Sequence, residues 1–478
     1  MKKSRFLFID IMNKSEGSSN SLAILCIAAS ASRHHDVEVM IDSFPPGSSP
    51  SQIADQLCKN EADLIGFSVN ALNEHMICEV VRAIRGKSKS IYIVMGGPSA
   101  SYSIQVRQVA DFVVYGEGED AVYELAEVFS NNAQGDLLNG KINLPGVSGR
   151  FDNHPDTTRF FCDLSKSPSP LVPTGNSKRF IPKNGNSYMY WETTRGCSYN
   201  CAFCCYNLNG RKFRELPHDR LAVELEYLKE YCTKHLFITD SVLGGRKPRT
   251  KRVLKMLAQL NVKKSVRLRA EYIDNELAEL LFNANITYLD LGLQTTNPNL
   301  SWARSNDLEA MLKALVYLNN AKVMANLDLI IGFPGDSIQT MRESIRFAIE
   351  TAKPNSIKIF PLKVYPGTVI HAKALSNGKK WLHYDPITCD TISAYSYTTK
   401  DFFELISYSN STAKLYRFLN QNYPTNPLIN KLSTYDRFFD FLKYQEDMDI
   451  EVFKLLHMPQ NSFDSDSINR LWMSFSTS

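Results

Sequence analysis

Long apolar runs and an excess of charge of one sign are both absent from this sequence. Its longest apolar stretches, such as Leu22–Ala31, fall well short of the roughly 20 residues that a membrane-spanning helix needs. The 54 basic and 50 acidic residues give a formal charge of only +4, which provides no broad electrostatic surface for nucleic acid. The sequence therefore predicts neither a membrane span nor a nucleic-acid partner.

Cysteine is sparse, with ten residues among 478. Small secreted domains that depend on disulfides contain cysteine at much higher density. Met1-Lys-Lys-Ser4 precedes a strand-like run rather than an apolar leader segment. We therefore expect free thiols in a reducing cytoplasm and no disulfide framework.

Three of these cysteines, Cys197, Cys201 and Cys204, lie within eight residues, separated by three and two positions. Three thiolates can bind three irons of a [4Fe–4S] cluster, which leaves the fourth iron open to another ligand. Zinc is the alternative, but zinc motifs usually contain two cysteine pairs and the other cysteines form no second pair at metal spacing. Cys205 directly follows the motif and could compete as a ligand. The spacing favours a [4Fe–4S] cluster with one open iron.

A strand-like run, Tyr188–Thr194, leads into this motif, and Phe203 precedes its last cysteine. The segment resembles the radical S-adenosylmethionine (SAM) superfamily, whose signature is three cysteines at this spacing with an aromatic residue before the third. The resemblance implies that Cys197, Cys201 and Cys204 bind the cluster, with Phe203 near the cofactors, and that the open iron binds SAM. It also implies an electron donor such as flavodoxin or ferredoxin and reductive cleavage of SAM to a 5′-deoxyadenosyl radical.

The first 140 residues alternate short apolar runs with helix-like segments, which is typical of an α/β, doubly wound parallel sheet. The strand-like runs are Arg5–Ile11, Val37–Asp42, Asp63–Val69, Ile91–Gly96 and Asp111–Tyr115. The helix-like segments are Ser21–Arg33, Ser51–Asn60, Asn73–Arg85 and Glu119–Ser130. In such a sheet, ligands bind beyond the carboxyl ends of the strands.

Three loops at those ends contain small or polar residues, and glycine there would let the backbone approach a ligand closely. The loops are Ser68-Val-Asn70, Gly96-Gly97-Pro98-Ser99 and Gly116-Glu-Gly118-Glu119. On composition alone, these glycines could equally belong to ordinary turns.

The second and third of these loops are similar to those of the cobalamin-binding, Rossmann-like domain that precedes many radical SAM cores. This resemblance implies a cobalamin cofactor contacted by the following residues: Ser68, Asn70, Gly96, Gly97, Gly116 and Gly118. The Asp-x-His-x-x-Gly signature, which supplies a histidine to cobalt, is missing, because the first loop begins Asp10-Ile-Met-Asn and the nearest histidine is His34. A domain of this shape that has lost cobalamin is the alternative.

Residues 141–185 are rich in Asn, Asp, Ser and Pro, and we expect an extended linker there. Residues 186–370 then alternate six strand-like runs with five helix-like segments, which suggests a barrel or open barrel of parallel strands. The resemblance to the radical SAM family implies a partial (β/α)6 barrel. The helix-like segments are Pro217–Tyr231, Pro248–Leu260, Asn275–Asn283, Asp307–Ala321 and Ser337–Ala352. The strand-like runs are Tyr188–Thr194, His235–Ser241, Val266–Ile273, Thr287–Gln294, Asn326–Phe333 and Ser356–Val364.

The third of these runs has Arg267, Arg269 and Glu271 at alternate positions, which would place them on one strand face. That face could line the barrel and hold SAM, with Glu271 as a contact, or form an outer charged surface. The resemblance further implies that Gln294 lies near the SAM ribose and that the backbone at Gly332 contacts adenine. The family often has Gly-Gly-Glu after the second strand, but no glutamate follows Gly244-Gly245 here. Asp328 stands where the family often has glycine.

Residues 371–478 are expected to form a mostly helical region, with helix-like spacing at Asp401–Ser407, Ala413–Gln421 and Asp436–Tyr444. Its recurrent aromatic residues, such as Tyr395 and Phe402, could form a core or cap a substrate pocket. The sequence does not distinguish a peptide, a natural-product intermediate or a lipid as substrate.

With both cofactors, the resemblance implies an enzyme that methylates an unactivated carbon: one SAM recharges cobalt and a second generates the radical. Cyclisation or ring rearrangement without net methylation is the first alternative. A methylthiotransferase is disfavoured because the amino-terminal region lacks a second set of three cysteines. A non-catalytic cobalamin or metal sensor is the alternative from a different class.

Overall fold

The computed structural model describes residues 3–11, 21–44, 47–70, 73–100, 102–152, 160–173, 187–206, 213–386 and 388–406, together with 409, 413 and 416. The chain divides into two compact units. The amino-terminal unit contains Met1–Gly196, Phe213–Thr239 and Gln259–Lys263; the carboxyl-terminal unit contains Cys197–Lys212, Asp240–Ala258 and Lys264–Ser478. Among the described residues, no helix is both long and apolar enough to cross a membrane. The domain boundaries expected at residues 140, 185 and 370 stay predictions.

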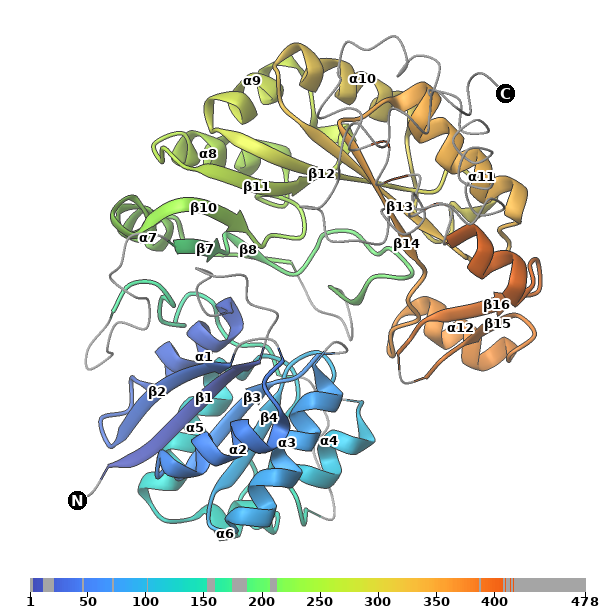
Figure 1. Cartoon of the computed structure of the whole chain (residues 1–478). Helices are drawn as coiled ribbons and strands as arrows, with labels where there is room; N and C mark the ends of the chain where they lie inside the picture. Colours follow the sequence, from blue (N-terminus) through green and yellow to red (C-terminus); the bar gives the residue numbers. More distant parts are fainter. Residues whose placement is uncertain are drawn as a thin grey trace. The chain divides into compact units, whose positions relative to one another are not determined.

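The amino-terminal unit is built on a six-stranded sheet whose strands run in the order β2-β1-β3-β4-β5-β6 (Figure 1). The strands are β1 (Ser4–Ile11), β2 (Val37–Phe44), β3 (Leu64–Ser68), β4 (Tyr92–Gly96), β5 (Phe112–Val114) and β6 (Val147–Gly149). The first five are parallel, and Phe6 pairs with both Val39 and Leu64. The five strands predicted for this region are therefore confirmed, as is the parallel, doubly wound sheet.

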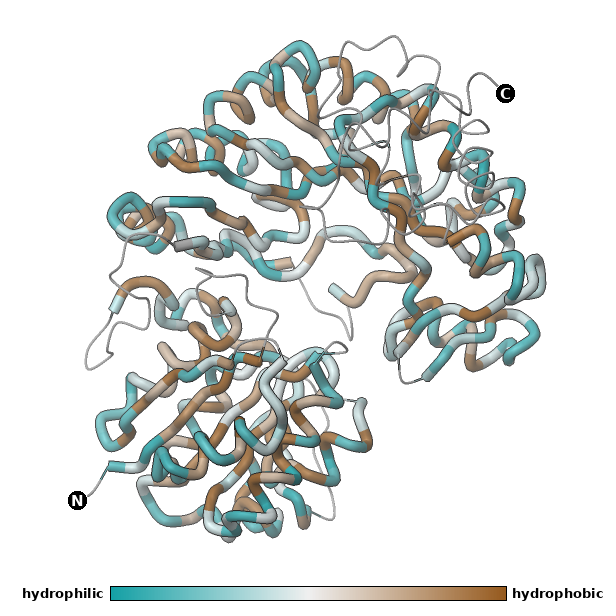
Figure 2. Tube along the Cα trace, viewed as in Figure 1, coloured by the Kyte–Doolittle hydropathy of each residue, from teal (hydrophilic) through white to brown (hydrophobic). Residues whose placement is uncertain are grey.

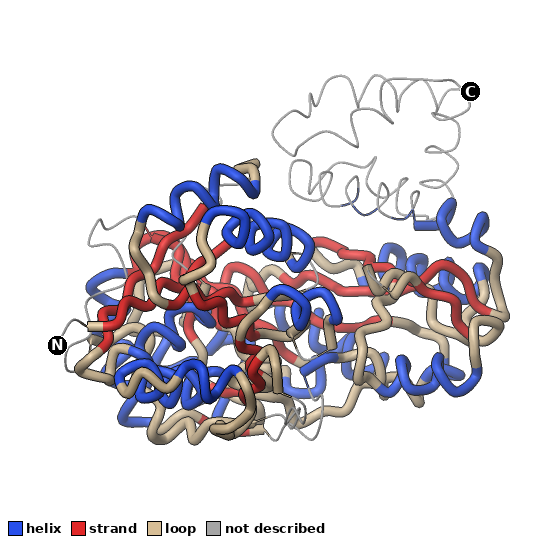
Figure 3. Tube along the Cα trace, turned by 90° about the horizontal axis from the view of Figure 1, so that it is seen from below, coloured by secondary structure: helices blue, strands red, loops and turns tan. Residues whose placement is uncertain are grey.

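Helices cover both faces of this sheet (Figure 3). They are α1 (Leu22–Ala31), α2 (Pro50–Lys59), α3 (Glu74–Lys87), α4 (Ile104–Val109), α5 (Gly118–Ser130) and α6 (Gln134–Leu138). Local sequence fixes some of their ends: α2 begins at a capping box between Ser49 and Gln52, with Pro50 in its first turn.

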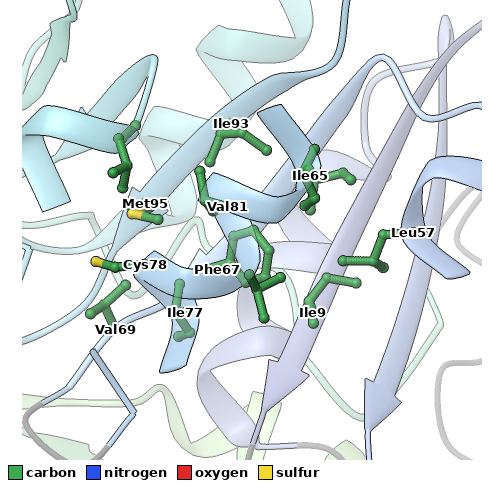
Figure 4. Close-up of a cluster of buried hydrophobic side chains, with 14 of the residues drawn as sticks. Ile9, Leu57, Ile65, Phe67, Val69, Ile77, Cys78, Val81, Ile93 and Met95 are labelled. Atoms are coloured by element: carbon green, nitrogen blue, oxygen red, sulfur yellow. The ribbon is translucent and has the colours of Figure 1, made fainter. Parts of the chain in front are cut away.

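Alternation along the strands divides the apolar side chains between two cores. On β1, Leu7 and Ile9 enter one core, whereas Phe6 and Phe8 enter the other. Figure 4 shows the first core, where Ile9 and other strand residues meet side chains of α2 and α3. Hydrophobic residues accordingly concentrate along the strands in Figure 2.

The sequence did not predict β6, which lies within the expected linker. It pairs antiparallel with β5, opposite Phe112–Val114. A strand of three residues, Val147-Ser-Gly149, is too short to show a hydrophobic period. Part of the expected linker therefore completes the edge of the sheet.

The amino-terminal unit also contains the start of the second strand–helix series. Strand β7 (Ser187–Trp191) pairs in parallel with β10 (Cys232–Ile238), and α7 (His218–Tyr231) joins them. Between β7 and α7, the two-residue strands β8 (Thr194–Arg195) and β9 (Arg214–Glu215) pair antiparallel. This short ladder pairs Arg195, which precedes the three cysteines in the sequence, with Arg214, which follows them.

The carboxyl-terminal unit continues the series with parallel strands paired in chain order. They are β11 (Lys263–Leu268), β12 (Ile286–Gln294), β13 (Ala325–Ile331) and β14 (Ser356–Pro361). The intervening helices are α8 (Lys247–Leu257), α9 (Asn275–Asn283), α10 (Leu308–Asn320), α11 (Ile338–Arg346) and the π-helical η4 (Phe347–Ala352). All six strands and five helices predicted from residue 186 onward are present.

The prediction for the third strand is wrong in its extent. Strand β11 ends at Leu268, and the 3₁₀ turn η2 (Ala270–Tyr272) follows, closed by a bond from the Tyr272 amide to the Arg269 carbonyl. Strand alternation therefore does not continue through this stretch. The Arg267 side chain is 52% exposed and that of Arg269 only 9%, so Arg267, Arg269 and Glu271 do not share one strand face.

The described part of the region after residue 370 contains α12 (Val369–Asn377), the antiparallel hairpin of β15 (Leu382–Tyr384) and β16 (Thr391–Ala394), and helical residues 399–406. The helix predicted at Asp401–Ser407 is confirmed over residues 401–406. The hairpin was not predicted, because its strands have only three and four residues. Most of the helix predicted at Ala413–Gln421, and all of that at Asp436–Tyr444, lie outside the described residues.

Candidate functional site

The three motif cysteines lie on the segment between β8 and β9, and all are free and partly buried. Burial, together with the charges of the nearby Cys205, Cys201 and Cys197, raises the pKa of the Cys204 thiol to about 12, so the sulfur atoms lie close enough to repel as thiolates. A bound metal centre would reverse this effect by stabilising the thiolates. The grouping therefore fits a metal cluster.

The three motif sulfur atoms do not all lie within 4.8 Å of one another, which is a wider spacing than that of the ligands of a single zinc ion. In a tetrahedral site with Zn–S bonds of about 2.3 Å, the ligands are about 3.8 Å apart. Within the described part of the chain, two groups of three potential ligand atoms lie within 4.8 Å of one another, and neither includes a motif cysteine. Thiolates that each bind a different iron of a cube stand farther apart.

Backbone bonds anchor the cysteine segment within the carboxyl-terminal unit. The Ala202 amide donates to the Ala303 carbonyl at 2.9 Å, and the Ala202 carbonyl accepts from the Ile370 amide at 3.0 Å. The Phe203 ring packs edge-on against Phe333, with centroids 5.6 Å apart. Phe203 thus helps to fix the segment; its predicted contact with a cofactor stays a prediction.

Arg304 places a positive charge beside the cysteines. Its Nη1 donates to Cys201 Sγ at 3.7 Å, and its Nη2 donates to the Gly292 carbonyl at 2.7 Å. Burial lowers the pKa of Arg304, while the Cys201 thiolate opposes this. Sequence reasoning missed this residue, because Arg304 lies 103 positions from Cys201 and belongs to no motif.

Gln294, predicted to lie near the SAM ribose, has two features of a ligand-binding residue. Its φ is +67°, a left-handed conformation that costs a non-glycine residue on the order of 1 kcal/mol. Its side-chain Oε1 is buried and has no hydrogen-bond partner among the described residues. A buried acceptor without a donor is unfavourable unless a ligand supplies one. These properties fit the predicted role.

Glu271 is already paired within the protein. Arg269 donates to both of its carboxylate oxygens, at 3.2 and 2.6 Å, and the Arg269 guanidinium lies 4.1 Å from the Tyr199 ring centre. The Tyr272 hydroxyl donates to the Gly245 carbonyl at 2.8 Å. Residues after β11 therefore lie beside both the cysteine segment and the Gly244-Gly245 turn.

Gly332, predicted to contact adenine, is covered on one side by the region after residue 370. Its carbonyl accepts from the Tyr397 hydroxyl at 2.6 Å, and a Cβ added there would lie 2.5 Å from the Phe402 ring. Phe402 is fully buried, whereas Tyr395 and Phe403 are more than half exposed. The aromatic residues of this region thus include both core and surface positions.

The glycines of the amino-terminal loops fall into two groups. An added Cβ at Gly97 would lie 2.6 Å from the Val69 carbonyl oxygen, and one at Gly116 would overlap the Phe160 backbone; both residues have positive φ. Gly96 and Gly118 have only ordinary contacts, at 3.4 Å. Packing of the loops against neighbouring backbone therefore explains Gly97 and Gly116 without a ligand.

Ser68 and Asn70 lie at the carboxyl end of β3 and are partly exposed. The Asn73 side chain holds this loop by donating to the Ser68 carbonyl at 3.0 Å and accepting from the Asn70 amide at 2.8 Å. Polar side chains that a neighbouring residue fixes at this edge fit a ligand site of a doubly wound sheet.

Asp10, in the loop that lacks the Asp-x-His-x-x-Gly signature, and His34, the nearest histidine, both have partners within the protein. The Asp10 carboxylate accepts from the Ser21 amide at 2.6 Å, immediately before α1. The buried His34 pairs through Nε2 with Glu127 at 2.9 Å. Because its Nε2 is engaged in this pair, His34 is poorly suited to be a cobalt ligand.

Comparisons with known proteins cover both parts of the chain. A family model of the radical SAM superfamily matches residues 191–348, and one of the B12 binding domain matches residues 9–126. An uncharacterized methyltransferase of Pyrococcus horikoshii is 23% identical over 390 residues, which are 77% of this chain and 82% of the relative. The cobalamin-dependent radical SAM methyltransferase TokK of Streptomyces tokunonensis is 24% identical over 65% of this chain; the match spans about half (48%) of TokK.

The fold is also similar to that of a solved structure. The radical SAM methyltransferase TsrM from Kitasatospora setae, with cobalamin and a [4Fe–4S] cluster bound, superposes with a TM-score of 0.64 at 18% identity, over 78% of each chain. The family matches follow the same order along the chain as the sheet of the amino-terminal unit and the later strand–helix series. This chain therefore combines a B12 binding domain, matched over residues 9–126, with a radical SAM domain, matched over residues 191–348, and its cofactors are a [4Fe–4S] cluster, SAM and cobalamin.

Proposed function

We propose that this enzyme methylates an unactivated carbon of a polar small molecule or peptide in a cobalamin-dependent radical reaction. The presence of a B12 binding domain together with a radical SAM domain in one chain carries this proposal, and relatives named as methyltransferases support it. The cofactors supply a 5′-deoxyadenosyl radical from SAM and a methyl group carried on cobalamin. The protein contributes binding, orientation and exclusion of water.

The residues proposed for the cluster are Cys197, Cys201 and Cys204. Arg304 would offset the negative charge of the Cys201 thiolate through its contact at 3.7 Å. Gln294 would accept a hydrogen bond from a hydroxyl group of SAM, because its buried Oε1 lacks a donor in the described structure. Each role follows from the charge or hydrogen-bonding capacity of a side chain close to the cysteine segment or at the end of a parallel strand.

The substrate proposal rests on a polar strand face in the carboxyl-terminal unit. On β12, Leu289, Leu291 and Leu293 are buried, whereas Asp290 and Gly292 point to the opposite, partly exposed face. The helices α9–α11 lie along one side of these strands (Figure 1), where α9 contacts β12 and α11 contacts β13. The buried leucines therefore lie on the side that the helices cover. The other face is therefore the one available for ligands.

Four charged side chains meet on this face. The strand register places Arg267 beside Asp290, and Asp328 beside Lys358. Lys358 donates to Asp290 at 2.9 Å, and Arg267 is 4.0 Å from the same carboxylate. The two cations are thus directed mainly toward Asp290.

Asp328 differs from Asp290, because its Oδ1 is buried without a hydrogen-bond partner among the described residues. Burial, reinforced by the charge of Asp290, raises the pKa of Asp328 to about 7. A substrate hydroxyl, amide or amine could supply the missing donor. This arrangement favours a polar substrate over a hydrocarbon such as a lipid tail, which would leave the carboxyl group unsatisfied.

An external one-electron donor, such as flavodoxin or ferredoxin, would reduce the cluster. A reducing cytoplasm would suit this chemistry and the ten cysteines, none of which forms a disulfide in the described structure.

The test is anaerobic reconstitution with iron, sulfide and hydroxocobalamin, followed by desalting and metal analysis. About four irons and one cobalt per chain are expected. SAM labelled with a deuterated methyl group then reports the reaction, because methylation transfers the label to the product and a rearrangement does not. Zinc in place of iron, or no SAM cleavage by the reconstituted protein, would contradict the proposal.

A further inference from the structure

A cluster of buried ion pairs in the amino-terminal unit joins the loop after β5 to the ladder of β8 and β9. Glu117 and Glu119, in this loop and the first turn of α5, are each only 5% exposed. Arg195 and Arg214 are direct cross-strand partners in the β8–β9 ladder. Two acidic residues spaced by two thus face two arginines that the ladder holds side by side.

Each arginine is bound by more than one group. Arg214 donates to both carboxylate oxygens of Glu117, at 3.0 Å to Oε2, and to the Cys162 carbonyl at 2.8 Å. Arg195 donates to Glu119 at 2.6 Å and, on its other edge, to Glu192 at 2.8–3.1 Å. Two-point guanidinium–carboxylate contacts fix orientation as well as distance.

These contacts also explain why the acidic residues stay charged. Burial alone would raise the pKa of Glu117, but the Arg214 hydrogen bonds and the charges of Arg195 and Arg214 lower it to about 2. Carboxylate and thiol atoms of Glu117, Glu119 and Cys162 lie within 4.8 Å of one another, as in a metal site. The two guanidinium groups already provide the positive charge that a metal ion would bring.

The two arginines flank the cysteine segment along the chain. Arg195 lies two residues before Cys197, and Arg214 lies ten residues after Cys204. We infer that Glu117 and Glu119 are positioning residues, which clamp the two ends of the cluster-binding segment to the loop after β5 of the B12 binding domain. This gives the loop a role distinct from the predicted contact of Gly116 and Gly118 with cobalamin.

The glycine geometry agrees with this role. Gly116 has a φ of +102°, and its Cα lies against the Phe160 backbone, where the Glu117 amide donates to the Phe160 carbonyl at 2.9 Å. The glycine therefore permits the turn that directs Glu117 toward Arg214. Neither observation requires a ligand.

The test uses Glu117→Gln and Glu119→Gln in the whole 478-residue chain, with Glu124→Gln as the control, because Glu124 is an exposed residue of the same helix α5. Each variant is reconstituted with iron, sulfide and hydroxocobalamin. Cobalt content, the rate of iron loss to a chelator, and the electron paramagnetic resonance spectrum of the reduced cluster with and without SAM are then measured.

The Glu117→Gln and Glu119→Gln variants should retain as much cobalt as the Glu124→Gln control. They should lose iron about 10-fold faster, in line with the effect of residues that orient metal ligands. They should also show a changed spectral response to SAM. Loss of cobalt with unchanged iron would overturn the inference and assign the loop to cobalamin, and behaviour like Glu124→Gln would overturn it as well.

A second variant keeps the test decisive if the glutamine variants do not fold. Arg214→Lys retains the buried positive charge but cannot donate to both Glu117 oxygens in the same fork. Faster iron loss in this variant, at unchanged cobalt content, supports the clamp; iron retention equal to that of the unmodified protein refutes it. Because these measurements do not involve methylation, they are independent of the proposed reaction.

Discussion

Substituting Gly97 and its neighbour Gly96 with alanine should have different effects, although both belong to the same predicted cobalamin loop. At Gly97, alanine would have to adopt a φ of +101° with its Cβ 2.6 Å from the Val69 carbonyl oxygen and 2.9 Å from the Val69 nitrogen. The left-handed conformation alone costs about 1–2 kcal/mol, and the backbone displacement adds to it, so we expect a total of about 2–4 kcal/mol. At Gly96, the nearest side-chain atom is Val114 Cβ at an ordinary 3.4 Å.

The assay is thermal unfolding combined with cobalt analysis after reconstitution. Gly97→Ala should lower the melting temperature by about 4–16 °C, and Gly96→Ala should change it little. If this loop contacts cobalamin, Gly96→Ala should retain less cobalt while remaining folded and keeping its iron. A melting temperature unchanged in Gly97→Ala would refute the packing argument, and full cobalt retention in Gly96→Ala would argue against the predicted docking of cobalamin on this loop.

Three further predictions concern the carboxyl-terminal unit. Alanine at Cys197, Cys201 or Cys204 should abolish cluster absorbance and SAM cleavage, whereas Cys205→Ala should preserve both; loss of iron in Cys205→Ala would show that the ligand assignment is wrong. Arg304→Gln should lower the cluster reduction potential by tens of millivolts or more, because a cation beside Cys201 is removed; a redox titration against Arg304→Lys tests this, and equal potentials would contradict it. The folded pKa of Asp328, about 7, lies above its unfolded value of 3.8, so the free energy of unfolding should fall as pH rises through this window. Asp290, Lys358, Arg267 and Arg304 act on this group, and urea unfolding at several pH values should show a flatter profile for Asp328→Asn; an identical profile would refute the assignment.

The sequence was sufficient for features that depend on neighbouring residues. The cysteine spacing, the aromatic Phe203 and the alternation of apolar strands with helices are local patterns, and the fold class inferred from them is confirmed. The strands missed by sequence reasoning, β6, β15 and β16, have three or four residues each, too few for a period to be recognised. The error at β11 came from extending an alternating pattern across a 3₁₀ turn.

Side-chain partners distant in sequence could not be predicted. Arg304 and Cys201 are 103 positions apart, and Arg214 and Glu117 are 97 apart. No local pattern connects such residues, because the fold brings them together. Conversely, the sequence left turn glycines and ligand-binding glycines as equal alternatives, and backbone contacts account for Gly97 and Gly116 without a ligand.

The ion pairs of Glu117 and Glu119 have a practical consequence for dissecting this enzyme. A recombinant fragment that ended near residue 140 would include both glutamates but neither Arg195 nor Arg214. The carboxylates of Glu117 and Glu119 would then be buried without a neutralising positive charge, or the surrounding structure would have to open to water. Either change would lower the free energy of unfolding by several kcal/mol. Poor expression or weak cobalamin binding by such a fragment would then report its missing counterions rather than the properties of the domain. The B12 binding domain is better studied alone in a fragment that carries glutamine at positions 117 and 119, or in one that extends past Arg214.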